Sequence, residues 1–190
     1  MKKNSLQSIT EGAIIVALAM VLSYIPHSVG ISSIEVLYGV VPLFLYSWRR
    51  GFKAGVIAGI AWGLLDLILR GLSSGSVLNA WQGILEYPVA FGLLGLAGIW
   101  SKAIKTKLDE HLSIGSLVII SSLVALFGKY LIHFFAGVLV WGSYAPKAFN
   151  PWTWSLLVNG GSAIVTLVFV IIIMLLLKRV LPKIINWRLK

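Results

Sequence analysis

The feature that most constrains the fold is a series of long apolar stretches separated by short polar segments. We predict spans at about 8–25, 34–48, 53–70, 77–101, 114–141 and 152–178. A helix needs roughly 20 residues to cross about 30 Å of hydrocarbon, so only the second stretch, which carries Glu35 and Pro42, is marginal. The pattern predicts an all-α polytopic membrane protein with six transmembrane helices, in a single transmembrane domain over residues 1–190.

Composition agrees with a membrane protein and excludes several other classes. Hydrophobic residues make up 58% of the chain and charged residues 12%, about half the charged share of a soluble domain. The sequence has no cysteine, which excludes disulfides and thiolate metal sites. A net charge of +10 would suggest nucleic acid in a soluble protein, but here we assign it to cytoplasmic loops and expect no nucleic-acid partner.

Lysine and arginine are distributed unevenly between alternate loops. With the N-terminus inside, the outer loops hold only Arg70 and Lys147, and Lys129 lies within the fifth span. The inner segments hold the other thirteen: Lys2, Lys3, Arg49, Arg50, Lys53, Lys102, Lys105, Lys107, Lys178, Arg179, Lys183, Arg188 and Lys190. This bias predicts an N-in, C-in orientation, with the stretch from Lys102 to Ser113 as a cytoplasmic connection. Because Glu11 interrupts the first apolar run, we expect a retained span and not a signal peptide.

Motifs for catalysis are weak or missing. The sequence contains neither a Walker A motif nor HExxH, and its histidines are scattered, so we predict no ATP site, no metal and no enzymatic cofactor. Residues 71–75 match Gly-x-Ser-x-Gly, but a nucleophile elbow requires a strand before it and a helix after it. We interpret this match as a turn between two helices. Binding or transport is favoured over an enzyme, although a membrane enzyme using Glu86 and His133 as acid and base is an alternative.

Polar residues inside the spans mark a candidate site, because ionisable groups are costly in lipid. Asp66 lies near the outer end of the third span. With a rise of about 1.5 Å per residue, Glu86, His133 and Asn159 lie ~13, ~12 and ~10 Å below the outer ends of their helices. Three antiparallel helices are therefore expected to place polar side chains at one level of the outer half of the membrane.

Helical spacing groups further residues around this level. Trp154 flanks the face of Asn159 and does not share it. Simpler interpretations remain open: a structural ion pair between Glu86 and Lys129, a hydrogen bond from His133 between helices, and an interfacial belt of aromatic residues. Four residues of the fifth span are four apart and share one face: Lys129, His133, Gly137 and Trp141.

The chemistry of these groups favours a flat, heteroaromatic and cationic ligand. Tryptophan faces bind flat rings and cations. The carboxylate of Glu86 attracts a cation more strongly where the dielectric constant is low. Asn159 both donates and accepts hydrogen bonds, which suits the edge of a heteroaromatic ring.

The chain resembles the thiamin-specific branch of the substrate-binding S components of energy-coupling factor (ECF) vitamin transporters. The similarity extends over nearly the whole chain, in the same order and at the same helix positions. The stretches that carry it are Ser47–Gly55, Leu85–Gly92, Lys129–Phe134 through Gly137 to Trp141–Gly142, and Asn150–Ser155 to Asn159–Gly160.

The resemblance implies an outward-facing thiamin site in a six-helix fold. Glu86 would face the positive or amino groups of thiamin, His133 and Trp141 would border its rings, and Asn159 would bond the pyrimidine. The remaining residues of the predicted ligand site are Tyr87, Lys129, Gly137 and Trp154.

The family also implies partners. Ala13 and Ala17 match the alanine motif by which S components dock on the transmembrane coupling subunit, and two ATPase subunits would hydrolyse ATP. We therefore expect a bacterial plasma-membrane protein that binds thiamin for ATP-driven uptake. The alternatives are a solitary cation-coupled permease, or an S component for a thiamin precursor or another flat vitamin.

Two positions depart from the family pattern. Trp154 stands where thiamin binders often carry tyrosine, which removes a hydroxyl from the expected site. The first outer loop has no tryptophan at residues 31–34, and Tyr38 is the candidate to replace it. Elsewhere, Gly55, Gly59 and Gly63 form a ridge of small residues that we expect to pack against another helix of the same chain.

Overall fold

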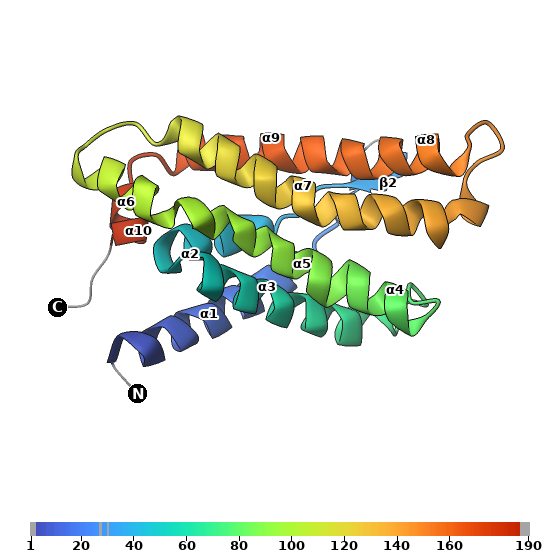
Figure 1. Ribbon diagram of the computed structural model, residues 1–190, viewed down its shortest axis with the longest axis horizontal. Helices are drawn as coiled ribbons and strands as arrows, with labels where there is room; N and C mark the ends of the chain where they lie inside the picture. The colour runs from blue at the N-terminus through green and yellow to red at the C-terminus, as the bar shows by residue number, and fades with distance from the viewer. Residues whose placement is uncertain (1–2, 27, 30, 187–190) are drawn as a thin grey trace.

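The computed structural model describes residues 3–26, 28–29 and 31–186, so Lys2, Arg188 and Lys190 of the charge pattern lie outside the described residues. The described chain is an elongated bundle whose long helices run side by side (Figure 1). Helices dominate, as predicted, and Phe52–Gly71, Ala80–Asp109, Gly115–Leu139 and Pro151–Leu176 are long and apolar enough to cross a membrane. Leu6–Leu22 forms a shorter apolar helix.

The described elements follow the predicted stretches closely, with several helices divided into shorter segments. Their bounds are α1 Lys3–Leu22, β1 Ser28–Val29, β2 Ile31–Glu35, α2 Val40–Arg50, α3 Phe52–Asp66, η1 Leu67–Gly71, α4 Ala80–Ile84, η2 Leu85–Val89, α5 Ala90–Leu93, η3 Leu94–Trp100, α6 Ser101–Asp109, α7 Gly115–Leu139, η4 Gly142–Tyr144, α8 Pro151–Ser155, η5 Leu156–Gly160, α9 Gly161–Leu176 and α10 Leu181–Asn186.

The second predicted helix, 34–48, is wrong at its beginning. Residues 31–35 form β2, which pairs antiparallel with β1, and α2 begins only at Val40. Side chains of α9 bind the backbone here: Glu35 N–H donates to Ser162 Oγ at 3.1 Å, and Leu37 N–H donates to Thr166 Oγ1 at 3.1 Å. These tertiary hydrogen bonds satisfy donors that would otherwise favour a helix.

The connection expected from Lys102 to Ser113 is shorter than predicted. The chain remains helical to Asp109 as α6, because Ile104 and Leu108, four residues apart, are both buried. The Nδ2 of Asn186 donates to Asp109 Oδ1 at 2.7 Å, so α10 packs beside this helix. Residues 72–75 form a turn, as predicted for the Gly-x-Ser-x-Gly match.

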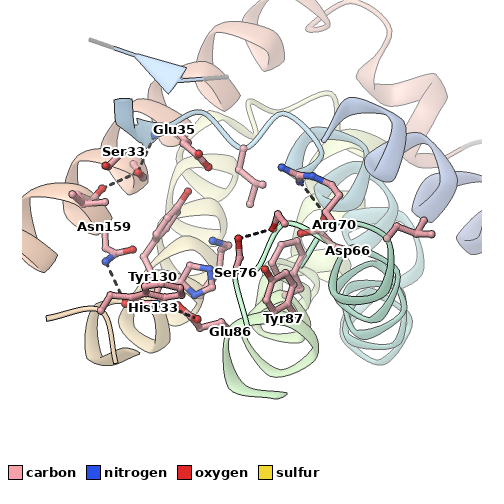
Figure 2. A pocket seen from close by; sticks show the side chains of 18 of the residues that line it. Ser33, Glu35, Asp66, Arg70, Ser76, Glu86, Tyr87, Tyr130, His133 and Asn159 are labelled. Carbon is pink, nitrogen blue, oxygen red and sulfur yellow. Dashed lines mark hydrogen bonds and ion pairs between the residues drawn. The ribbon is translucent and has the colours of Figure 1, made fainter. Parts of the chain in front are cut away.

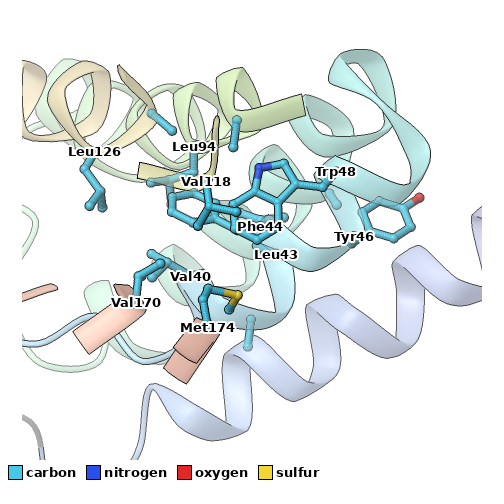
Figure 3. Packing of buried hydrophobic residues seen from close by; sticks show 14 of the residues in the cluster. Val40, Leu43, Phe44, Tyr46, Trp48, Leu94, Val118, Leu126, Val170 and Met174 are labelled. Carbon is cyan, nitrogen blue, oxygen red and sulfur yellow. The ribbon is translucent and has the colours of Figure 1, made fainter. Parts of the chain in front are cut away.

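Helix α2 lies at the centre of the core. Trp48 and Phe44 are fully buried and pack among residues of neighbouring helices, including Leu94, Val118 and Val170 (Figure 3). The indole N–H of Trp48 donates to Ser121 Oγ at 3.0 Å. A short helix surrounded by longer ones therefore anchors the bundle through its aromatic side chains.

The glycine ridge of α3 packs against the segment 85–100, as expected. A methyl group at Gly59 would overlap the carbonyl oxygen of Phe91, and one at Gly63 would overlap that of Tyr87. Only hydrogen side chains permit this close approach. The ridge thus fixes the backbone that carries Glu86 and Tyr87.

Charged residues join α1 to α2 at the opposite end of the bundle from β2. Glu11 accepts from Arg49 Nε at 3.0 Å and from Arg50 Nη2 at 2.6 Å. The acid that interrupts the first apolar run is therefore paired with two guanidinium groups, which lowers the cost of placing it in a membrane helix.

Candidate functional site

A cavity of about 550 Å³ opens between α3, η1, η2, α7, η5 and β2 (Figure 2). Its volume lies within the range of small-molecule sites. Its described lining is rich in hydroxyl, carboxylate and amine groups, including Glu35, Asp66, Glu86, Lys129 and His133. Polar groups in a bundle of apolar helices are typical of a binding site.

Three of the segments that line the cavity are π-helical turns, η1, η2 and η5. They carry Arg70, Glu86 and Asn159 respectively. In η2 the ring of Pro88 cannot donate a backbone hydrogen bond, and a wide turn accommodates it. Such turns frequently occur at functional sites because they redirect side chains locally.

The carboxylate of Glu86 is held by two donors. Gln82 Nε2 and Trp141 Nε1 both donate to Glu86 Oε2, the second at 3.3 Å. Gln82 is itself buried, donates to the carbonyl oxygen of Ser76 at 3.0 Å and accepts from Leu78 N–H at 2.9 Å. The orientation of Glu86 is therefore determined by α4, by the loop before it and by the end of α7.

Lys129 lies at the base of the pocket with its ammonium group over aromatic rings. Its Nζ is 4.1 Å from the centroid of Tyr130 and 5.4 Å from that of Phe91, and the residue is 4% exposed. Among the described residues Lys129 forms no ion pair, so the alternative interpretation of a structural pair with Glu86 is wrong. Cation–π contacts stabilise the buried charge instead.

Asn159 and His133 meet where α7 approaches η5. Asn159 Nδ2 donates to the carbonyl oxygen of His133 at 3.2 Å and to Ser155 Oγ at 3.1 Å, which leaves its side-chain oxygen to accept from a ligand. His133 Nδ1 is buried and has no hydrogen-bond partner among the described residues. Gly137 allows the approach, because a methyl group there would overlap Ser155.

Six residues predicted for the ligand site line this one cavity: Glu86, Tyr87, Lys129, His133, Trp141 and Asn159. Gly137 and Trp154 are absent from the described lining. Gly137 packs against Ser155 and Asn159. The ring of Trp154 packs against that of Phe149, with the two centroids 5.3 Å apart. Tyr38, the candidate substitute for a loop tryptophan, packs edge-on against Phe169 at 5.1 Å.

The cavity also has a polar end that the sequence interpretation did not include. Asp66, predicted only as an acid near the outer end of the third span, pairs with Arg70 at 2.9 Å. Glu35 and three serines, Ser73, Ser74 and Ser76, also line the cavity. The described lining thus contains three carboxylates and two cations, Lys129 and Arg70, and its formal charge favours a monocation.

Comparison with known proteins identifies the family. The family model described as thiamine transporter protein (Thia_YuaJ) matches residues 9–186. The chain belongs to the thiamine transporter family. It is therefore a member of a family of membrane transporters and not of an enzyme family, as the sequence indicated, and thiamin is the ligand that the family transports.

Individual members of the thiamine transporter family are similar over most of their length. The chain is 48% identical over 179 residues to the thiamine transporter ThiT of Lacticaseibacillus paracasei, covering 92% of this chain and 88% of the relative. It is 30% identical over 152 residues to ThiT of Bacillus subtilis, covering 77% and 76%. The solved structure of ThiT from Listeria monocytogenes superimposes with a TM-score of 0.85 at 33% identity, over 96% of this chain and 99% of that one.

Proposed function

We propose that this chain is the substrate-binding subunit that captures thiamin outside the cell for ATP-driven uptake by an ECF complex. The observation that carries the proposal is a polar pocket with an excess of carboxylates in a member of the thiamine transporter family. Thiamin is flat, heteroaromatic and permanently cationic. A low-dielectric pocket with an excess negative charge favours such a ligand over neutral rings.

The pocket suggests a binding mode. Glu86 faces the thiazolium or the amino group, while His133 and Trp141 border the rings. The side-chain oxygen of Asn159 accepts a hydrogen bond from the aminopyrimidine, because its amide nitrogen is already engaged. Tyr87 forms a wall, and its ring is stacked on that of Phe91 with centroids 6.4 Å apart.

The other predicted site residues act around this core. Lys129 sets the charge at the base of the pocket from its position over Tyr130. Because Gly137 has no side chain, the segment that carries Ser155 and Asn159 can pack closely against α7. Trp154 packs against Phe149 outside the described lining of the pocket.

We infer a multi-pass topology with six crossings and both ends in the cytoplasm of a bacterial cell. Four long apolar helices and the shorter Leu6–Leu22 supply five of them. The sixth consists of α2 together with the strand segment that precedes it, because α2 alone has 11 residues. The distribution of Lys and Arg supports this orientation.

We infer that the ECF coupling subunit docks on α1. Ala13 and Ala17 are both exposed and are four residues apart, so they form one small-residue surface. Replacing both with tryptophan should prevent co-purification with the coupling subunit and leave thiamin binding intact. Ala103→Trp, at an exposed position on α6, is the matched control. Unchanged co-purification of the double variant would place docking elsewhere.

Uptake of labelled thiamin by cells or proteoliposomes tests the proposed function. Accumulation should require the coupling subunit, the two ATPase subunits and ATP together with this chain. Accumulation by this chain alone, driven by an ion gradient, would instead identify a solitary cation-coupled permease.

A further inference from the structure

One end of the pocket is lined by the Asp66–Arg70 ion pair and by Ser73, Ser74 and Ser76. Asp66 Oδ1 and Arg70 Nη1 are 2.9 Å apart, and their side chains are 8% and 32% exposed. The hydroxyls of Ser74 and Ser76 form a hydrogen bond of 2.6 Å with each other. This group lies across the pocket from Asn159 (Figure 2).

A thiamin-like ligand has three parts in a row: a pyrimidine, a thiazolium and a hydroxyethyl tail. If the pyrimidine lies at Asn159 and the ligand spans the pocket, its tail is placed at the opposite end, beside Arg70 and the serines. The tail exists in two chemical forms, a free alcohol and a phosphate ester. The charges at the polar end determine which of these two forms binds more tightly.

Arginine with nearby hydroxyl groups would ordinarily suit a phosphate, because guanidinium binds phosphate oxygens through paired hydrogen bonds. Here Asp66 occupies part of that donor set and neutralises its charge. Glu35 places a further carboxylate in the same lining. A phosphate monoester brings about −1.5 to −2 charges and would meet these carboxylates.

We propose that the Asp66–Arg70 ion pair makes this pocket select the free alcohol of its ligand over the phosphate ester. The inference rests on the proposed function and adds a specificity determinant to it. Asp66 acts as a repulsive element against the ester and also keeps Arg70 from binding it. An alcohol, which is neutral, hydrogen-bonds to the serine hydroxyls without disturbing the pair.

The test is a selectivity ratio, the dissociation constant for thiamin monophosphate divided by that for thiamin, measured by calorimetry on purified protein. The native chain should bind thiamin at least about tenfold more tightly than the ester. Asp66→Asn should lower this ratio by about tenfold, with weaker thiamin binding and tighter ester binding. Combining it with Arg70→Gln should remove the gain in ester binding, because the freed guanidinium is gone.

Two control variants distinguish an effect of the Asp66–Arg70 ion pair from an effect of the net charge of the pocket. Glu35→Gln changes the formal charge of the pocket by the same amount without releasing Arg70, and should alter the ratio by less than about threefold. Asp109→Asn, at an exposed position of α6 far along the chain from the pocket lining, should leave both constants unchanged. If Glu35→Gln moves the ratio as far as Asp66→Asn, net charge determines selectivity and the ion pair does not.

Arg70→Gln alone keeps the proposal testable if Asp66→Asn does not fold. It should raise the ratio in favour of thiamin, because the carboxylate of Asp66 then meets the ester without its partner. A ratio that neither variant changes overturns the proposal. Failure of the native chain to bind thiamin at all would instead refute the proposed function, so the two failures are distinguishable.

Discussion

Neutralising the carboxylate of Glu86 while keeping its shape should weaken thiamin binding substantially. In Glu86→Gln the side chain keeps an oxygen that can accept from Gln82 and Trp141, so the pocket should retain its geometry. What is lost is one negative charge facing a cation in a partly buried site. Charged hydrogen bonds of this kind contribute about 2–3 kcal/mol, which corresponds to about 30–150-fold in Kd.

Isothermal titration calorimetry on detergent-purified protein measures this change directly. Glu110→Gln is the matched control, because Glu110 is exposed at the end of α6, and its Kd should equal that of the native chain. Thermal unfolding without ligand should be similar for both variants. An unchanged Kd for Glu86→Gln would show that the carboxylate does not face the cation and would refute the proposed binding mode.

Three further substitutions test the structure around the site. Gln82→Leu removes the partners of two backbone groups, Leu78 N–H and the carbonyl of Ser76, and a donor to Glu86. It should cost about 1–3 kcal/mol in unfolding and weaken thiamin binding; unchanged binding would contradict its positioning role. Gly59→Ala should destabilise the helix packing by about 1–3 kcal/mol in thermal unfolding, and an unaltered melting temperature would contradict the close approach. Thr166→Val removes the acceptor of Leu37 N–H, so that amide should exchange hydrogen faster; unchanged protection would mean that the bond contributes little.

The level of the pocket was predictable from the sequence because it depends on helix rise alone. Glu86, His133 and Asn159 were expected at one depth on three helices, and the structure places them around one cavity. The face shared by Lys129, His133 and Trp141 was also predictable. Helix α7 is continuous from Gly115 to Leu139, and Trp141 follows its last residue by only two positions.

The position of Trp154 was harder to predict from helical spacing. Spacing arguments assume a regular turn, but η5 begins directly after α8 and its wider turn changes the angle between Trp154 and Asn159. Of the segments that line the cavity, only η2 carried a sequence signal for such a turn, the proline at position 88.

The hairpin and the polar end of the pocket depend on contacts between residues far apart in sequence. The backbone of Glu35 is bound by Ser162, more than a hundred residues later, and local propensity contains no information about that partner. Asp66 and Arg70 are four residues apart, a spacing that predicts an ion pair on a helix. That Glu35 and Glu86 line the same cavity, however, follows from tertiary packing of β2 and η2, which local spacing does not contain.

Titration of the purified chain with thiamin, followed by intrinsic tryptophan fluorescence, tests the central claim most directly. Trp141 lines the pocket and donates to Glu86, so a ring bound beside it should quench its emission. Saturable quenching that is strongly reduced in Trp141→Phe is the predicted result. Unchanged fluorescence, together with no heat of binding, would contradict the assignment of this pocket to thiamin.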